Sequence, residues 1–423
     1  MKEPLKERLI IQNFAGIKDI TLDVNKINVL IGPQATGKSV CAKLLYFFKS
    51  FPFQMSRSIG YYKKFDDFSQ ILIERFKVYF PPDCLGAEDY RIRYELADGN
   101  FLQISKKMTT EEPEFLCSEY FTGMWKKFSE HFTRLEKEVS KEDKINIYSD
   151  MLFRRGLSGN IIKDLEKTFS YRQILIPAGR SYMTLFLKDP FIVDQVKSPM
   201  DLFVKEFGSL YLSIKDYFYG NKIFSADKTL NSLIKKVLLG DYIQEKEDEF
   251  IKHNDGRIVK ITLSSSGQQE ILPLILTLRF LCLPGFMEFG ASVYIEEPEA
   301  HMFPLWQKYI VELIAAVYNM SEMPLQFFIT THSPYILTSF NNLLQAGMAR
   351  EANKDNEEKL SQLYKIIPDE QIISPGELNA YSLTEKGLKD IIDKETGLIL
   401  AKEIDRVSDR LSTNFYNLLD LEK

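Results

Sequence analysis

A glycine-rich segment, Gly32 to Ser39 (GPQATGKS), has the residue types and spacing that bind phosphate. Its two glycines allow a loop whose backbone N–H groups bind phosphate oxygens. Lys38 reaches the terminal phosphates of a nucleotide, and the Ser39 hydroxyl is a magnesium ligand. The segment follows an apolar run at 27–31 and precedes a helical pattern, which is the context that such a loop needs. The expected nucleotide contacts are Gly32, Pro33, Gln34, Ala35, Thr36, Gly37, Lys38, Ser39 and Val40.

Two acidic residues follow another apolar run, Ala291 to Ile295. Carboxylates at the end of a buried strand are unfavourable unless they bind metal or act as a base. Glu296 is therefore a candidate magnesium ligand, and Glu297 a candidate base that polarises water. His332 follows a third apolar run, 325–330. A lone histidine is usually a surface or core residue, but this one is expected at the edge of a parallel sheet where ligands collect.

A serine-rich segment, SSSGQQE at 264–270, opens a long apolar helix pattern. Ser266 is a good N-cap candidate and Glu270 suits the first helical turn, so a capping role explains part of the segment. Serine and glycine at a helix N-terminus also form an anion site, because free N–H groups are available there and no Cβ obstructs the ligand.

Short apolar or alternating runs predict strands on both sides of a helical block. The strand patterns cover 8–14, 20–24, 27–31, 71–80, 90–96, 101–104, 173–177, 248–252, 256–263, 291–295 and 325–330. This order predicts an α/β core with a helical insertion and a helical C-terminal tail. The expected units are an N-lobe with the phosphate loop at 1–108, the insertion at 109–172, a strand plus helical subdomain at 173–255, a C-lobe at 256–345 and the tail at 346–423.

The composition is that of a globular protein and excludes several classes. Of 423 residues, 45% are hydrophobic, and 54 Lys and Arg stand against 59 Asp and Glu, a net charge of −5. A surface that is basic all over is excluded, although a local basic groove is not. The four cysteines contain no CxxC, which argues against zinc-ribbon and disulfide scaffolds. The longest apolar stretch, 271–286, is broken by prolines and an arginine, and no signal-peptide core is present, so a cytoplasmic protein is expected.

The order of these motifs resembles the head of an ABC-type ATPase, a P-loop NTPase fold with mixed sheets. The segments SSSGQQE, IEEPEAHMFP and ITTHSPYIL resemble the OLD/RecF-like branch, which is related to SMC heads. The resemblance covers about 7–110 and 170–345, and it implies ATP and Mg²⁺ as cofactors and hydrolysis of ATP to ADP and phosphate. It implies catalytic roles for Lys38, Glu297 and His332, the last as a switch histidine at the γ-phosphate. Magnesium would be held by Ser39 and Glu296.

The resemblance also implies a partner, because in this family ATP lies between two heads. Ser265, Ser266 and Gly267 would contact the ATP bound to the opposite subunit. One chain has one phosphate loop and one serine–glycine signature, so the partner is most simply a second copy. The expected assembly is a homodimer, or a higher even-numbered homo-oligomer.

Several positions depart from this pattern or extend it. Position 296 is Glu where many ABC proteins have Asp. Asn13 and Phe14 resemble the adenine side of SMC-type heads. Gln103 is either the lobe-coupling glutamine or an ordinary polar strand residue. Arg180, in the segment IPAGRS, faces phosphate or the dimer partner, or else forms a surface salt bridge.

Missing features narrow the expected function. Full-length OLD nucleases carry a TOPRIM nuclease domain, whereas the 91 residues after His332 contain no strand-borne acidic cluster. The chain is therefore similar to stand-alone AAA-type ATPases lacking TOPRIM, as in bacterial phage-defence systems such as Septu or PARIS. There the ATPase stands beside a separate effector, often a nuclease. The resemblance thus implies an ATP-dependent sensor that regulates a separate nuclease in antiviral defence.

The alternative is a RecF-like repair ATPase that clamps DNA directly. The paired basic residues would then form a path for nucleic acid; otherwise they lie on solvated helix faces. These pairs are Lys106-Lys107, Lys126-Lys127, Arg154-Arg155 and Lys235-Lys236. The EEPEAH and THSP segments argue against a membrane-transporter subunit, and the intact catalytic set argues against a scaffold without hydrolysis.

Overall fold

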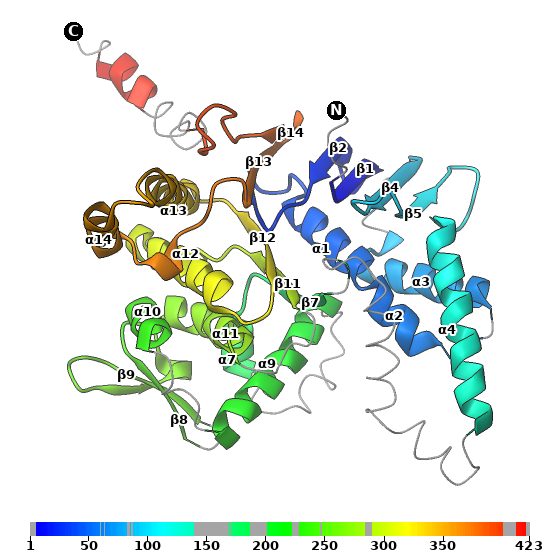
Figure 1. Cartoon of the computed structure of the whole chain (residues 1–423), viewed down its shortest axis with the longest axis horizontal. Coiled ribbons are helices and arrows are strands. Elements are labelled where there is room, and N and C mark those ends of the chain that lie inside the picture. Colours follow the sequence, from blue (N-terminus) through cyan, green and yellow to red (C-terminus); the bar gives the residue numbers. More distant parts are fainter. Residues whose placement is uncertain are drawn as a thin grey trace.

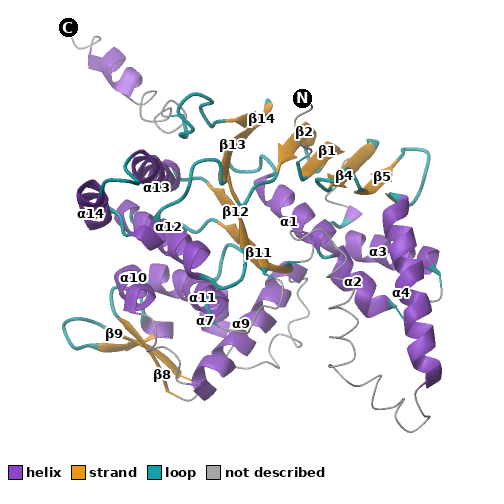
Figure 2. Ribbon diagram, viewed as in Figure 1, coloured by secondary structure: helices purple, strands orange, loops and turns teal. Residues whose placement is uncertain are grey.

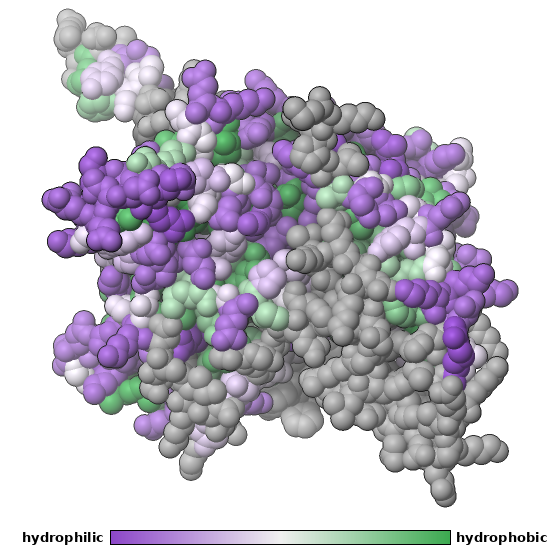
Figure 3. Space-filling model, in the orientation of Figure 1, coloured by the Kyte–Doolittle hydropathy of each residue, from purple (hydrophilic) through white to green (hydrophobic). Residues whose placement is uncertain are grey.

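A computed structural model describes residues 6–59, 61–62, 64–82, 85, 88–138, 169, 171–186, 201–221, 228–245, 248–283, 290–400 and 412–419. A six-stranded sheet runs through the middle of the molecule with helices on both sides, and a five-stranded sheet lies at the upper right (Figures 1 and 2). No helix within these ranges is long and apolar enough to span a membrane. The polar side chains on the visible face are dense over α13 and α14 (Figure 3).

The central sheet has six strands in the order β14-β13-β3-β12-β11-β7. Five of them are parallel, and only β14 runs antiparallel to its neighbour. Their bounds are β3 Ile27–Ile31, β7 Arg172–Ile176, β11 Ala291–Glu296, β12 Leu325–Thr331, β13 Leu378–Thr384 and β14 Gly387–Asp390. The phosphate loop and both acidic residues therefore follow neighbouring or nearby strands that end at the same edge.

The inner strands β3, β11 and β12 are mainly apolar and almost fully buried, because both faces of the sheet are covered there. Val29 packs into one core with Val293 and Phe327, whereas the adjacent residue Leu30 packs into a second core with Tyr294. Successive strand residues point to opposite faces, so covering both faces removes the alternation of polar residues. The first core also contains α11–α13, and the second contains α1.

An antiparallel sheet of five strands covers α1 from the other side, in the order β2-β1-β4-β5-β6. Its bounds are β1 Arg8–Phe14, β2 Ile17–Asp23, β4 Tyr90–Glu95, β5 Phe101–Lys106 and β6 Glu114–Cys117. A small antiparallel sheet, β10-β9-β8, lies beside α10 in Figure 1, with bounds β8 Asp241–Glu245, β9 Asp248–Lys252 and β10 Ile258–Lys260.

The helices flank these sheets. They are α1 Lys38–Lys49, α2 Phe51–Ser58, α3 Phe65–Tyr79, α4 Glu119–Glu138, α7 Ser181–Phe186, α9 Leu202–Asn221, α10 Lys228–Leu238, α11 Ser266–Leu281, α12 Pro304–Met320, α13 Pro334–Ala352 and α14 Glu357–Ile366. Two short 3₁₀ turns, η4 Ile261–Leu263 and η5 Asp369–Gln371, complete the assignment. A further helical segment at 412–419 projects from the body near the C-terminus (Figure 1).

The strand predicted at 71–80 is wrong, because this segment belongs to helix α3. Its buried residues include Phe68, Leu72, Phe76 and Tyr79, whereas Val78 is exposed. Spacings of three and four place the buried side chains on one helical face. The predicted segment, 71–80, was too short to reveal this helical spacing.

Four strands, β6, β8, β13 and β14, were not predicted from the sequence. Strand β8, at Asp241–Glu245, precedes the two strands that were expected at 248–252 and 256–263. Strand β6 is the edge strand of the five-stranded sheet, and it lies in the segment that was expected to be a helical insertion. Residues 139–168 of this segment lie outside the described residues. Strands β13 and β14 lie in the C-terminal segment, which was expected to be helical. The tail is thus partly helical, through α13 and α14, and partly an extension of the central sheet.

Candidate active site

Lys38 begins α1 and lies at the centre of the phosphate loop. Its Nζ donates to the backbone oxygens of Gly32, at 2.9 Å, and Pro33, at 2.7 Å. Only 5% of the residue is exposed. Burial lowers the pKa of the ammonium, and the nearby Glu297 and Glu299 carboxylates oppose this shift. Lys38 is therefore held within reach of any anion that enters the loop.

Both glycines of the loop are required by close neighbours. A Cβ on Gly32 would collide with the backbone oxygen of Leu383 in β13. A Cβ on Gly37 would lie 2.6 Å from the Ile17 side chain, and Gly37 also has a φ of +97°. Ala35 takes a left-handed φ of +59°, which is uncommon for a residue with a side chain. The loop thus has the shape expected of a phosphate cradle.

Glu296 ends strand β11 and fits the role of a cation ligand. The residue is 7% exposed, and its Oε2 accepts a 3.3 Å hydrogen bond from the backbone N–H of Ala178. Its Oε1 is buried without a hydrogen-bond partner. A buried carboxylate oxygen without a partner is unfavourable unless a cation or donor completes it. Among the described residues, no group of three His, Cys, Asp or Glu could hold a metal.

Three side chains predicted to be catalytic lie in a row. Nζ of Lys38 is 3.5 Å from Nδ1 of His332, and Nε2 of His332 is 3.4 Å from Oε1 of Glu297. The Glu297 side chain is 41% exposed and that of His332 is 29% exposed, so water reaches both. A carboxylate, an imidazole and an ammonium beside a phosphate cradle are the groups that activate water and stabilise a transferred phosphoryl group.

Glu299 belongs to this site, although it was given no role from the sequence. Its Oε1 accepts hydrogen bonds of 2.7 Å from both the Thr331 hydroxyl and the His332 backbone N–H. Its Oε2 is buried and has no hydrogen-bond partner. The third acid of the EEPEA segment was the available signal, but its contacts depend on the parallel pairing of β11 with β12.

The signature segment caps α11, but not through the residue expected. Ser265 is the N-cap: its hydroxyl accepts from the backbone N–H of Gln268, whose side chain in turn bonds back to Ser265. Ser266 is the first helical residue, and both serines are exposed. A Cβ on Gly267 would lie 2.9 Å from the backbone oxygen of His301. The helix start is thus packed against the loop that follows Glu297, while its serines face solvent.

The two residues proposed for the adenine side behave differently. Asn13 is exposed, with a φ of +53°, at the end of β1. Ile17, at the start of the next strand, is the residue that faces Gly37. Phe14 is fully buried against Phe76, Phe80 and Tyr90, so it does not face a nucleotide. Asn13 alone of the pair remains a candidate.

Gln103 and the paired basic residues lie on other elements than the groups around the phosphate loop. Gln103 is buried in β5, where its amide is 3.5 Å from the Ser105 hydroxyl, as an ordinary polar strand residue would be. The 126–127 pair lies on α4 and the 235–236 pair on α10, at opposite sides of Figure 1, and 154–155 lie outside the described residues. The 126–127 and 235–236 pairs therefore lie on opposite sides of one chain, whereas the 106–107 pair lies at the end of β5.

Arg180 matches neither expectation from the sequence. Its side chain is 0% exposed, so it forms no surface salt bridge, and it is directed at backbone oxygens. Burial lowers the pKa of the guanidinium, and the adjacent Glu270 carboxylate is the main opposing influence. Glu270 bonds the N–H groups of Arg180 and Ser181, at 2.8 Å each, instead of supporting its own helix start.

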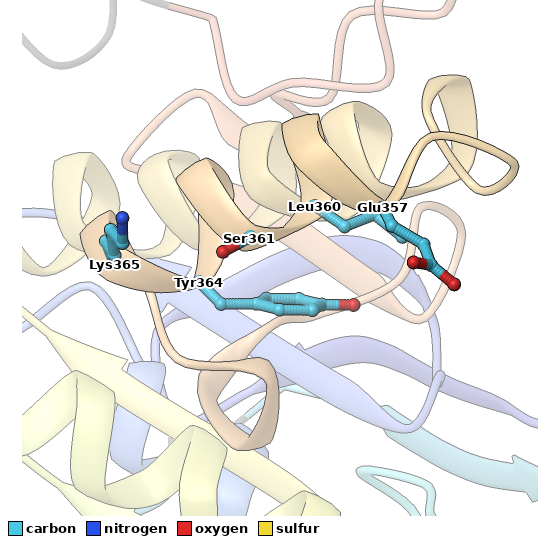
Figure 4. A pocket seen from close by; sticks show the side chains of 5 residues that line it. All are labelled: Glu357, Leu360, Ser361, Tyr364 and Lys365. Carbon is cyan, nitrogen blue, oxygen red and sulfur yellow. The ribbon is translucent and has the colours of Figure 1, made fainter.

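A surface hollow on α14 is separate from these groups. It is lined by Glu357, Leu360, Ser361, Tyr364 and Lys365, all on one helix (Figure 4). Helix α14 lies at the edge of the molecule, well away from the start of α1 (Figure 1). The chemistry described above is therefore confined to the edge of the central sheet.

Two protein-family profiles match adjacent parts of the chain. Residues 6–183 match the family described as "AAA ATPase domain", and these include the phosphate loop. Residues 193–338 match the family described as "AAA domain, putative AbiEii toxin, Type IV TA system". The second match contains the serine–glycine signature, the acidic pair and His332.

Similar solved structures include three SMC heads. The SMC head domain from Thermotoga maritima has 12% identity and a TM-score of 0.37, over 80% of this chain and 92% of that one. An Smc head bound to the C-terminal winged-helix domain of ScpA has 10% identity and a TM-score of 0.45, over 93% and 100%. An Smc head with an extended coiled coil, bound to the C-terminal domain of ScpA from Pyrococcus furiosus, has 11% identity and a TM-score of 0.39, over 97% and 100%.

The family matches and the topology agree on the class of protein. A parallel sheet carries the phosphate loop after one strand, the acidic pair after a second and the histidine after the strand between them. Two segments of the chain thus match families of AAA-type ATPase domains, and the chain has an α/β fold of the P-loop NTPase kind.

Proposed function

We propose that this chain hydrolyses ATP and acts as a nucleotide-dependent switch. The observation that carries the proposal is the row formed by Lys38, His332 and Glu297, with separations of 3.5 and 3.4 Å. Lys38 binds the terminal phosphates, Glu297 accepts a proton from the attacking water, and His332 donates to the γ-phosphate oxygens. Ser39 and Glu296 hold Mg²⁺, which when bound neutralises developing charge on the phosphates.

We further propose that two copies close head-to-tail around ATP. Ser265, Ser266 and Gly267 are then supplied to the site of the other copy. Two exposed apolar side chains flank this region: Leu263 is 79% exposed and Phe303 is 65% exposed. Exposed apolar side chains beside polar anchors are typical of protein–protein contact surfaces.

The third part of the proposal is the output of the switch. The family matched by the second half is described by its name as a toxin of a toxin–antitoxin system, which supports a role in bacterial conflict. We infer that the ATPase holds or releases a separate effector in antiviral defence. This effector is most simply a nuclease, and the neighbouring gene is the first place to look for it. ATP-dependent closure of the two copies is the step that such control would use.

The test uses Glu297→Gln, which is expected to bind ATP but to hydrolyse it far more slowly. The mass of this variant is measured with ATP and Mg²⁺, with and without the product of the neighbouring gene. A defined complex with the neighbour supports the switch. An ATP-dependent dimer that instead retains DNA in moderate salt would favour the DNA clamp, and hydrolysis at the wild-type rate would remove Glu297 from its role.

A further inference from the structure

Arg180 has an unusually complete set of partners. A guanidinium has five N–H donors, and five acceptors surround this one. Nε donates to the Glu270 backbone oxygen at 3.1 Å, and Nη1 donates to Pro177 O at 2.9 Å and Glu296 O at 2.7 Å. Nη2 donates to Glu297 O at 3.0 Å and lies 3.3 Å from Oε1 of Glu270. The side chain thus joins the loop after β7, the end of β11 and helix α11.

Two of these acceptors belong to the residues that would hold metal and activate water. Glu297 has a φ of +44°, a left-handed conformation that is strained for a residue with a side chain. Such a conformation persists only when its surroundings determine it. Arg180 holds the carbonyl oxygens of the two peptide units that meet at the Glu297 Cα, and this restrains the backbone that aims the Glu297 carboxylate.

Arg180 is also bound to helix α11, which begins with the serine–glycine signature, through Glu270. Glu270 is the fifth residue of α11, and its carboxylate is 1% exposed. It accepts from the backbone N–H groups of Arg180 and Ser181, so the arginine is fixed in both backbone and side chain. Ser266 and Gly267 begin the same helix. A movement of α11 against the sheet would therefore be passed through Arg180 to the backbone of Glu297.

We propose that Arg180 is a positioning residue for Glu297, and that Glu270 makes this positioning depend on the place of α11. The inference rests on the proposed function, in which Glu297 is the base. It predicts that Arg180 affects hydrolysis and leaves ATP affinity unchanged. Within the described part of the chain, the hydrogen bonds that Arg180 donates go to Pro177, Glu270, Glu296 and Glu297, and none of these residues belongs to the phosphate loop.

Arg180→Lys is the first variant to test. Lysine keeps the charge opposite Glu270, but its three donors cannot satisfy five acceptors in a planar fork. We expect kcat to fall by about 10- to 100-fold, the range seen when groups that orient active-site residues are removed. The dissociation constant for ATP should change by less than about twofold, since the interaction acts on the hydrolytic step.

A second variant and a control separate positioning from loss of stability. The double variant Arg180→Met with Glu270→Met removes both charges, so no unpaired charge is left in the core. Lys49→Met is the matched control: Lys49 and Glu7 form another buried pair, at 2.7 Å and with side chains 1% and 6% exposed, at the far end of α1. The control should lower thermal stability while the folded protein keeps its kcat.

The deciding measurement is a double-mutant cycle with Glu297→Gln. If Arg180 acts through Glu297, Arg180→Lys should lower kcat in the wild-type background and have no further effect on the residual rate of Glu297→Gln. Equal losses in both backgrounds, a wild-type kcat in Arg180→Lys, or a matching fall in Lys49→Met would each overturn the inference. Failure of the wild-type protein to hydrolyse ATP would instead reject the proposed function.

Discussion

The contact between Gly32 and strand β13 provides a direct test of how the tail meets the phosphate loop. In Gly32→Ala, the new Cβ would overlap the backbone oxygen of Leu383 and would lie 3.1 Å from its carbonyl carbon. Ordinary contact begins at 3.4 Å, and the obstructing atoms are backbone, which cannot rotate away. The loop and β13 must therefore move apart by several tenths of an ångström at the carbon and by more at the oxygen.

The expected size of the effect follows from overpacking. Inserting a methyl group into a well-packed site usually lowers stability by about 1–3 kcal/mol. Part of this strain would be relieved by displacing the loop, and each 1.4 kcal/mol of lost binding energy corresponds to about a tenfold weaker affinity. We expect Gly32→Ala to be folded, less stable, and at least about tenfold weaker in binding ATP.

The assay pairs thermal unfolding with titration of a fluorescent ATP analogue. Gly123→Ala is the matched control, because Gly123 lies within α4 and its added Cβ meets nothing within 4 Å. Alanine is the better helix former, so this control should be as stable as the wild type or slightly more stable. Wild-type stability and ATP affinity in Gly32→Ala would refute the packing of β13 against the loop.

Three other substitutions test the remaining groups of the site. Lys38→Ala should abolish ATP binding, measured by the same titration, because the loop loses its buried cation. Gly267→Phe should spare ATP binding by the monomer but impair the ATP-dependent dimer, measured as mass by light scattering, because even a Cβ would lie 2.9 Å from His301 O. Glu299→Gln should lower the rate of phosphate release from ATP about tenfold, with ATP binding retained. The substitution removes the negative charge from the group that accepts hydrogen bonds from Thr331 and His332.

Each of these has an outcome that would contradict it. Near-normal nucleotide affinity in Lys38→Ala would remove the phosphate-loop assignment. Intact ATP-dependent dimerisation in Gly267→Phe would show that the signature does not act across an interface. Phosphate release by Glu299→Gln at the wild-type rate would mean that His332 is held well enough by its other neighbours.

The phosphate loop was predictable from sequence because its interactions are local. Lys38 bonds the backbone of residues five and six positions earlier, and the flanking strand and helix are read from their own patterns. The acidic pair and His332 were located in the same way, each at the end of an apolar run. Their convergence followed from the rule that parallel strands end at one edge.

The misassignments have a common cause. The apolar content of segment 71–80 suits either a strand or a helix. Burial of one helical face in the core beneath the five-stranded sheet favours the helix. Strand β14 was missed because it has only four residues and lies at the sheet's edge. Strand β13 was missed because its sequence, LNAYSLT, mixes polar and apolar residues without a clear strand pattern. The pairing partner of β13, strand β3, is about 350 residues earlier in the chain.

The sequence alone determined the phosphate-loop motif and the order of the motifs, because both depend on neighbouring positions in the chain. Only the tertiary structure decided what surrounds them. It placed Leu383 against Gly32, Glu299 beneath His332, and Arg180 between α11 and the Glu297 backbone. These contacts join residues that are distant in sequence, so no local pattern encodes them, and they form only when the sheets and helices pack.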